Sequence, residues 1–386
     1  MTAHEYLKVN PIIVFLYYLP IKIFLTIAHF FPLQRKIVFD NFCGKGLGDD
    51  PKYILLQMIK DKVKAKYIWL TKDLSIEVPP EVTKVKFGSW KAEYHYITAK
   101  IWIDNVKNVP KPSKRKGQFY LQTWHGSFAN KMVEKDAEKA LSSEYVKMSQ
   151  EDSSKIDLMY SNNDFKIAIF KKSFWYSGPV IKSDSPQLSV LFSPPRFLKE
   201  KIFNQFKIDN RCKVLLYAPT FRRNGNIDIY KWDYQSILQV LEKKFKAPFI
   251  LFFRLHPNLQ NRNTLSLGEH IYDVTDYPDM DELIAISDIM ITDFSGVAYD
   301  MALIRKPVFL FALDYKDYIA NDRLQYFETK QLPFTFAQSE NELEKNILSF
   351  NDELFQKHVK NFFKIIGMNE SGNGAKYIAN LIGEHL

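Results

Sequence analysis

The sequence of 386 residues predicts an α/β protein with two Rossmann-like lobes that face each other across a cleft. From residue 37 onward, short runs of β-branched and aromatic residues alternate with helical stretches, which is typical of a parallel sheet flanked by helices. The alternation breaks at the segment LFSPPRF, near residue 193, and then starts again. The length agrees, because domains of about 150 residues predict two or three in this chain.

The composition excludes several classes of protein. Hydrophobic residues at 46% and charged residues at 25% argue against a disordered chain and against a polytopic membrane protein. Cys43 and Cys212 lie far apart, outside any CxxC pattern, so we expect neither a disulfide framework nor a zinc site. The net charge of +9 predicts an anionic partner, which could be a nucleic acid, a nucleotide or a membrane surface.

Residues 1–35 are predicted to form an apolar segment that associates with a membrane. The apolar stretch 11–33 is long enough to span a bilayer, but Pro20 and Lys22 in its middle disfavour a spanning helix. Basic flanks instead favour a helix lying in the plane of an anionic surface. These flanking residues are Lys8, Arg35 and Lys36. A core helix or helix pair is the alternative.

The first lobe is expected to cover residues 36–192. Its predicted strands are 36–42, 66–71, 82–87, 100–105, 117–124 and 157–162. Helices are expected between them, notably at 51–62 and 90–99.

The second lobe is expected to cover residues 193–340. Its predicted strands are 212–220, 249–255, 270–275, 288–293 and 307–313. Residues 341–386 are predicted to be helical and to brace the two lobes.

Ligands of open parallel sheets bind outside the carboxyl ends of the strands, so motifs at strand ends carry the functional hypotheses. The segment QTWHGS (122–127) follows an apolar strand. His125 could accept a proton from an attacking hydroxyl, Gly126 permits close backbone approach, and Ser127 could donate to an anion. A purely structural histidine is the alternative.

Two further strand ends carry cationic groups. In YAPTFRR (217–223), Thr220 supplies a hydroxyl and Arg222 a forked donor suited to phosphate, although a solvated basic turn is equally consistent. In FFRLHPN (252–258), period-two alternation places Arg254 and His256 on one face.

The segment TDFSGVAYD (292–300) follows a predicted strand. Ser295 and Gly296 open the next helix, so their N–H groups and the helix dipole would form an anion site. Asp300 would orient a ligand hydroxyl or form an ion pair within the helix.

Two other segments invite functional interpretation. The glycines of FCGKGLGDDPKYI (42–54) are a weak match to a phosphate loop, since Asp49 and Asp50 would repel phosphate. We expect a tight cleft-facing loop, with Asp50 capping the following helix. The basic stretch 107–116 is expected to be solvated or to contact anionic lipid.

In this order and spacing, the motifs resemble those of the CDP-glycerol glycerophosphotransferase family, which builds teichoic acids and related capsule polymers. The resemblance covers about residues 36–335. Its motifs are GKGLGDDPKYI, QTWHGS, YAPTFR, RLHPN, TDFSGVAYD and RKPVFLFALDYKDY.

The resemblance implies a GT-B-like fold, a peripheral location on the cytoplasmic face of the bacterial membrane, and transfer of glycerol phosphate from CDP-glycerol to a polyprenyl-linked glycan. His125 would be the general base, and His256 would bind the diphosphate or stabilise the leaving CMP. No cofactor and no metal are expected. The expected donor-binding residues are Thr123, Trp124, Gly126, Ser127, Lys182, Thr220, Arg222, Arg254, Ser295, Gly296 and Asp300.

Departures from the family pattern leave the alditol open, so another CDP-alditol such as a ribitol donor is possible. Ser127 and Phe128 stand where HGTP is common, Gly296 replaces a serine, and Lys182 replaces an arginine. The alternatives are a GT-B glycosyltransferase using a nucleotide sugar and a basic nucleic-acid-binding protein. The second is disfavoured because RNP-type motifs and a basic helix are absent.

Overall fold

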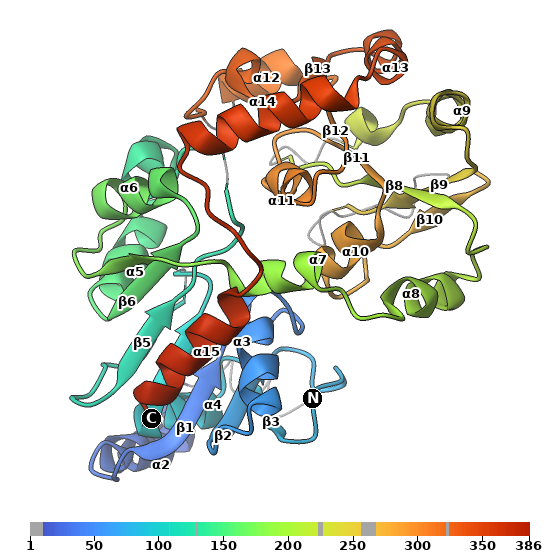
Figure 1. Cartoon of the computed structure of the whole chain (residues 1–386). Helices are drawn as coiled ribbons and strands as arrows, with labels where there is room; N and C mark the ends of the chain where they lie inside the picture. Colours follow the sequence, from blue (N-terminus) through green and yellow to red (C-terminus); the bar gives the residue numbers. More distant parts are fainter. Residues whose placement is uncertain (1–10, 108, 129, 223–226, 256–267, 322–323) are drawn as a thin grey trace.

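The computed structural model describes residues 11–386 except 108, 129, 223–226, 256–267 and 322–323. Two parallel sheets, each covered by helices, form two lobes (Figure 1). The predicted two-sheet α/β architecture is therefore confirmed. The prediction for His256 lies outside the described residues.

The first sheet has seven parallel strands in the order β3-β2-β1-β4-β5-β6-β7. They are β1 Gln34–Phe39, β2 Lys66–Thr71, β3 Val82–Lys86, β4 Ala99–Asp104, β5 Phe119–Gln122, β6 Leu158–Ser161 and β7 Val180–Lys182. All but β7 overlap predicted ranges, although β1 begins two residues and β4 one residue before its predicted start; β7 is a three-residue edge strand.

The second sheet has six parallel strands in the order β10-β9-β8-β11-β12-β13. They are β8 Lys213–Tyr217, β9 Phe249–Phe253, β10 Ile271–Asp273, β11 Ile289–Thr292, β12 Val308–Phe311 and β13 Thr335–Ala337. Every residue of β9 is buried, as expected for a strand with helices on both faces of its sheet. Only the short edge strand β13 was not predicted.

Helices cover both sheets and continue past the second one to the C-terminus (Figure 1). They are α2 Pro11–Ala28, α3 Asp49–Lys60, α4 Trp90–Thr98, α5 Ser143–Ser153, α6 Asp164–Ser173, α7 Ser189–Phe192, α8 Leu198–Phe206, α9 Tyr234–Phe245, α10 Met280–Ile286, α11 Val297–Leu303, α12 Tyr315–Asn321, α13 Glu340–Leu348, α14 Asp352–Ile365 and α15 Gly374–Glu384.

The C-terminal helices touch both lobes. Phe355 and Phe362 of α14 join the core of the second lobe. The chain then returns to the first lobe, where Ile378 and Ile382 of α15 pack in the same core as Ile54 of α3. Helices that follow the second sheet therefore pack on both lobes (Figure 1).

Polar contacts also join the lobes directly. Lys52 of α3 pairs with Asp279 and, at 2.8 Å, with Glu282 of α10. Asp279 caps α10 by accepting from two backbone N–H groups. The amide of Asn130 donates to the Phe327 carbonyl at 2.8 Å.

The N-terminal helix α2 packs on α4 through Leu25 and Ala28, which form a small core with Ile97. The outward residues Ile23, Ile27 and Phe30 are exposed, Phe30 by 84%. Across the part of the chain that the structure describes, no helix is both long and apolar enough to cross a bilayer.

One basic residue predicted to face a membrane, Lys36, is instead structural, and exposed Arg35 also bonds within the protein. Lys36 is buried and donates to the Thr98 hydroxyl at 2.7 Å. Arg35 donates to the Lys64 carbonyl at 2.6 Å. Lys8 lies outside the described residues.

The prediction that the loop 107–116 is solvated or contacts lipid is also wrong for two of its lysines. Lys107 is buried and pairs with Glu134 at 2.8 Å, while buried Lys111 pairs with Asp104 and Asp152, both at 2.7 Å. The acidic partners come from other parts of the first lobe, so the charge run alone did not reveal them.

Candidate active site

The segment after β5 turns sharply and exposes His125 at the carboxyl end of the first sheet. Trp124 and Gly126 both adopt positive φ angles, of 55° and 67°. The Gln122 side chain accepts the Trp124 N–H at 2.8 Å, which holds the turn. A positive φ is strained for a residue with a Cβ, so this geometry at Trp124 is maintained by its surroundings.

The hydrogen bond of His125 determines which of its nitrogens is basic. Its Nδ1 lies 3.0 Å from the Asn105 carbonyl, and a carbonyl can only accept, so Nδ1 carries the proton. In the neutral ring Nε2 then holds the lone pair. Trp124 stacks on the ring at 4.4 Å, and Phe42 lies 5.2 Å away on centroids. This half-buried imidazole is oriented as a proton acceptor.

The residue two positions on contacts the other lobe. The Ser127 hydroxyl donates to the Asp300 carboxylate of α11, and both residues are buried. Burial raises the pKa of Asp300 to about 7, while the Ser127 hydrogen bond and nearby Lys166 act in the opposite direction. The structure thus brings the His125 loop against α11. The Ser127 hydroxyl makes a hydrogen bond between the lobes.

Lys166 of α6 was not identified from the sequence. Its ammonium donates to the Gly126 carbonyl, directly after His125. Burial lowers its pKa to about 8, and the carboxylates of Asp50, Asp49 and Asp300 oppose that shift. No motif marks this lysine; its only sequence signal is its place in the first turn after Asn163, which caps α6.

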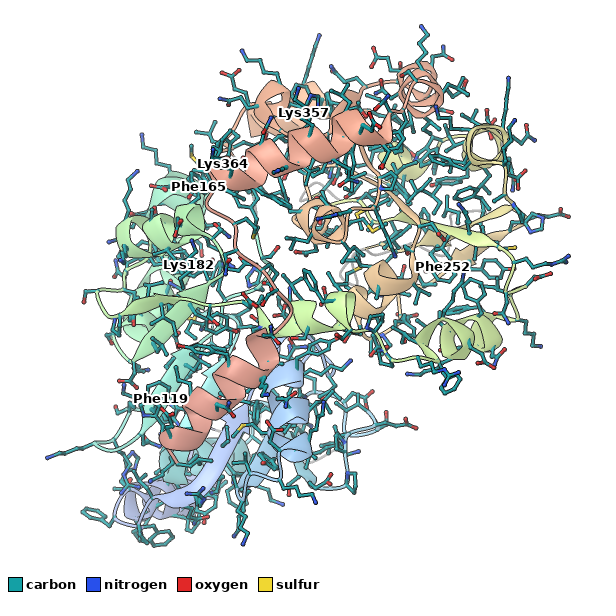
Figure 2. All side chains as sticks on the ribbon, in the orientation of Figure 1. Phe119, Phe165, Lys182, Phe252, Lys357 and Lys364 are labelled. Carbon is teal, nitrogen blue, oxygen red and sulfur yellow. The ribbon has the colours of Figure 1, made fainter. Side chains whose placement is uncertain are left out.

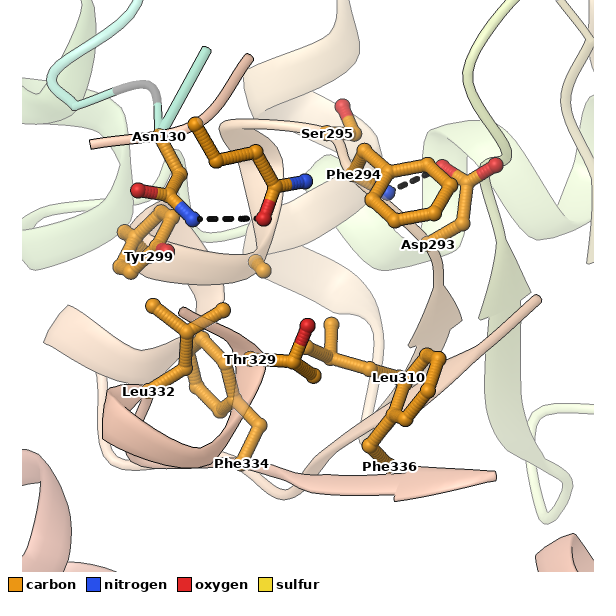
Figure 3. Close-up of a pocket in the computed structure, with 12 residues that line it drawn as sticks. Asn130, Asp293, Phe294, Ser295, Tyr299, Leu310, Thr329, Leu332, Phe334 and Phe336 are labelled. Carbon is orange, nitrogen blue, oxygen red and sulfur yellow. Dashed lines mark hydrogen bonds between the residues drawn. The ribbon is translucent and has the colours of Figure 1, made fainter. Parts of the chain in front are cut away.

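The start of α11 offers unoccupied donors. Among the described residues, none accepts a hydrogen bond from the N–H groups of Ser295 and Gly296. Ser295 also lines a pocket with Asn130, Asp293 and Tyr299 (Figure 3). An anion could be held here, although α11 is only seven residues long.

The guanidinium of Arg222 is paired with groups of the second lobe. It pairs with Asp293 at 2.8 Å and with Asp314 at 2.6 Å, and also donates to the Thr220 carbonyl at 2.7 Å. Arg222 is 4% exposed and lies over the Tyr318 ring. These contacts favour a structural role, so direct phosphate binding by Arg222 stays a prediction.

Arg254 and Thr220 keep some polar atoms available. Nη1 of Arg254 donates to the carbonyls of Val274 and Tyr277, at 3.0 and 2.6 Å. These are its hydrogen bonds in the described chain, so Nε and Nη2 could meet a ligand. Burial lowers the pKa of Arg254. The Thr220 hydroxyl oxygen is buried and has no partner among the described residues.

Thr123 and Lys182 make their polar contacts within the first lobe. The Thr123 hydroxyl donates to the Trp124 carbonyl at 2.7 Å, within its own loop. Lys182 is in the first lobe (Figure 2), at the end of the edge strand β7, and pairs with Asp164 at 2.8 Å. Their donor-binding roles stay predictions.

The glycine-rich loop differs from expectation at Asp50. The N-cap of α3 is Gly48, whereas Asp50 is buried in the first turn. Its carboxylate accepts from Tyr160, Ser185 and the Gln187 N–H, at 2.7 to 2.8 Å. Asp50 is thus a structural anchor between β6, α3 and the segment before α7.

The charged groups of this site are not arranged as a metal centre. In the described ranges, no group of three or more His, Cys, Asp or Glu side chains could hold a metal ion.

Residues 23–384 match the family model described as CDP-Glycerol:Poly(glycerophosphate) glycerophosphotransferase. The chain belongs to this family. The match confirms the family predicted from the strand-end motifs.

The sequence is similar to those of teichoic acid polymerases from two bacteria. A teichoic acid poly(glycerol phosphate) polymerase of Staphylococcus epidermidis is 29% identical over 90% of this chain. One of Bacillus spizizenii is 30% identical over 76% of it. The chain spans 50% of the first relative and 78% of the second.

A solved structure shares the two-lobed fold. It is a variant of the wall teichoic acid polymerase TagF with CDPG, at a TM-score of 0.78 and 27% identity. The superposition covers 91% of this chain and 88% of that one. The GT-B-like arrangement implied by the motifs therefore has a close structural counterpart.

Proposed function

We propose that this protein transfers glycerol phosphate from CDP-glycerol to a hydroxyl of a teichoic acid or related lipid-linked glycan, with release of CMP. The observation that carries this proposal is the geometry of His125. Its Nε2 is the basic nitrogen, at the end of a parallel strand, in the loop that touches α11 of the other lobe. The family match over residues 23–384 supports the reaction type.

His125 would act as the general base. Its Nε2 takes the proton of the acceptor hydroxyl while that oxygen attacks the phosphorus bearing the glycerol. A new P–O bond forms to the acceptor, the bond to the CMP oxygen breaks, and CMP leaves with the electron pair. Such phosphoryl transfer depends mainly on positioning and on positive charge around the phosphate.

The donor diphosphate would lie against the second lobe. The open N–H groups of Ser295 and Gly296 and the remaining donors of Arg254 are the described groups suited to it. Asp300, held by Ser127, would fix the start of α11 relative to His125. His256, next along the chain from Arg254 and Leu255, remains a predicted diphosphate ligand outside the described residues.

Attachment to a membrane would bring a polyprenyl-linked acceptor to the cleft. The exposed side chains Ile23, Ile27 and Phe30 of the α2 region support this part of the proposal. Trp90, 43% exposed, packs edge-on against Phe24 and widens this apolar surface. We place the protein peripherally, on the cytoplasmic face.

The test is CMP release from CDP-glycerol in the presence of a lipid-linked glycan acceptor, beside a panel of CDP-ribitol and UDP-sugars. His125→Ala should lower turnover by about 10²- to 10⁴-fold while donor binding by calorimetry persists. The control is His358→Ala, because His358 is exposed on α14. Turnover with UDP-sugars alone would contradict the proposal, as would full activity of His125→Ala.

A further inference from the structure

A lysine outside every recognised motif lies beneath the loop that carries His125. Lys166 is the third residue of α6, and its ammonium donates to the Gly126 carbonyl. The same ammonium lies 5.3 Å from the centroid of the Phe170 ring. Two contacts of different kinds therefore fix its position.

The surroundings of Lys166 come from both lobes. The carboxylates that act on it are Asp49 and Asp50, from α3, and Asp300, from α11. Asp50 is held by three hydrogen bonds and Asp300 by Ser127. The ammonium is thus the cation at a point where α3, α6 and α11 meet.

The hydrogen bond to Gly126 constrains the peptide that follows. A peptide unit is planar, so holding the Gly126 carbonyl also holds the Ser127 nitrogen and the direction of the chain into Ser127. Gly126 has a φ of 67° and open space where a Cβ would lie, so no side-chain packing at its Cα restrains this turn; a second restraint acts on Ser127, whose carbonyl accepts from the Asn163 amide at 3.0 Å. Ser127 must be placed correctly to reach Asp300.

We propose that Lys166 is a positioning residue for the transfer reaction: it fixes the Gly126–Ser127 peptide between the lobes and keeps a positive charge beside His125. The inference rests on the proposed function, because it assigns the role through His125 acting as a base. A cation near an imidazole opposes its protonation, so loss of the Lys166 charge is expected to make His125 easier to protonate.

Removing the ammonium has a defined electrostatic sign. Lys166→Met deletes a positive charge and leaves the neighbouring carboxylates less compensated, and both changes raise the pKa of His125, by roughly one unit. This variant leaves other ion pairs near the His125 loop in place. Among them are Lys107, over the Trp124 ring, with Glu134, and Lys111 with Asp104, the residue before the Asn105 carbonyl that contacts His125.

The experiment is an NMR titration of the full chain with labelled histidine, in which His125→Asn assigns the His125 signal. Lys166→Met should raise the His125 pKa by about one unit, whereas Lys166→Arg should stay within a few tenths because it retains the charge. Lys171→Met is the matched control, because Lys171 is exposed on the same helix.

Kinetics give a second readout. With CDP-glycerol, Lys166→Met should lower kcat at least tenfold at pH 7 while the donor KM changes less than threefold, and the acid limb of kcat/KM should move up with the His125 pKa. A large loss of donor binding with an unchanged His125 pKa would make Lys166 a ligand and overturn the positioning role.

The titration of the wild-type protein also tests the idea without a substitution. As Lys166 loses its proton near pH 8, the His125 signal should show a second inflection. An unchanged His125 pKa in folded Lys166→Met, or the absence of that inflection if this variant does not fold, would overturn the proposal. Failure of the wild type to release CMP would instead defeat the proposed function, since the titration does not depend on turnover.

Discussion

Ser127 of the first lobe donates its hydroxyl hydrogen to the carboxylate of Asp300 in the second lobe. Both residues are 2% exposed, so this hydrogen bond is shielded from water and sets the distance between the His125 loop and α11. A contact of this kind couples the position of the His125 loop to the packing of the two lobes. The first two predictions follow from it.

Ser127→Ala should destabilise the protein by about 1–3 kcal/mol, because the buried Asp300 carboxyl loses its hydrogen-bond donor. The free energy of unfolding, measured by urea titration at pH 7, checks this. Ser154→Ala is the control: Ser154 is exposed and bonds only the nearby Glu151 carbonyl, so a change below about 0.5 kcal/mol is expected. Equal effects of the two substitutions would show that the contact between the lobes is unimportant.

Asp300→Asn should change the pH dependence of stability. The folded-state pKa of Asp300, about 7, exceeds its ordinary value of 3.8, so the folded state binds the proton more tightly than the unfolded state does. The Asp300 carboxyl therefore lowers the free energy of unfolding as the pH rises from about 4 to 7, by up to about 1.4 kcal/mol per pH unit. The stability of Asp300→Asn relative to wild type should rise across this window and level off above it. Parallel curves would contradict the raised pKa.

Arg222→Met should act mainly on stability. The substitution leaves the buried carboxylates of Asp293 and Asp314 without their cation, which costs about 3–5 kcal/mol. Arg211→Met, at an exposed arginine paired with Asp209, is the control and should leave the stability nearly unchanged, because exposed ion pairs contribute little. Loss of donor binding in a variant of unchanged stability would instead identify Arg222 as a direct phosphate ligand.

Ile27→Glu combined with Phe30→Glu should weaken binding to anionic lipid vesicles at least tenfold, because both side chains are exposed and apolar. Vesicle co-sedimentation measures this. Leu354→Glu is the control, since Leu354 is an exposed apolar residue of α14, at the far end of the molecule (Figure 1). Equal loss in the two proteins would show that the α2 surface has no special part in attachment.

Strand positions were predicted well where the side chains carry a strong local pattern. The apolar runs that form β2 and β9 are buried along nearly their whole length. Each run is apolar at successive positions, which predicts a strand buried on both faces of the sheet. The edge strands β7 and β13 have three residues each and were missed. Three side chains are too few to establish a period of two; β10 is equally short but was predicted because it lies within the longer run 270–275.

The candidate site was predicted less evenly. His125 was identified because it ends a strand, and its place beside the other lobe agrees with that logic. Arg222 was predicted to bind phosphate, and the 107–116 loop to be solvated or to contact lipid. Arg222, Lys107 and Lys111 instead pair with carboxylates distant in sequence. Lys166 was overlooked for the same reason, because the Gly126 carbonyl that it contacts lies 40 residues away in the sequence.

The sequence by itself determined the two α/β lobes, the family and the histidine at the strand end, because hydrophobic patterns and short motifs are local properties of the chain. The tertiary structure alone decided which charges are free. Whether a lysine or arginine meets a ligand or a carboxylate depends on what folding places within about 3 Å of it, and in this protein Lys107 and Lys111 are paired with carboxylates inside the first lobe. The net charge of +9 therefore says less about partners than the few cations and N–H groups left open at the cleft.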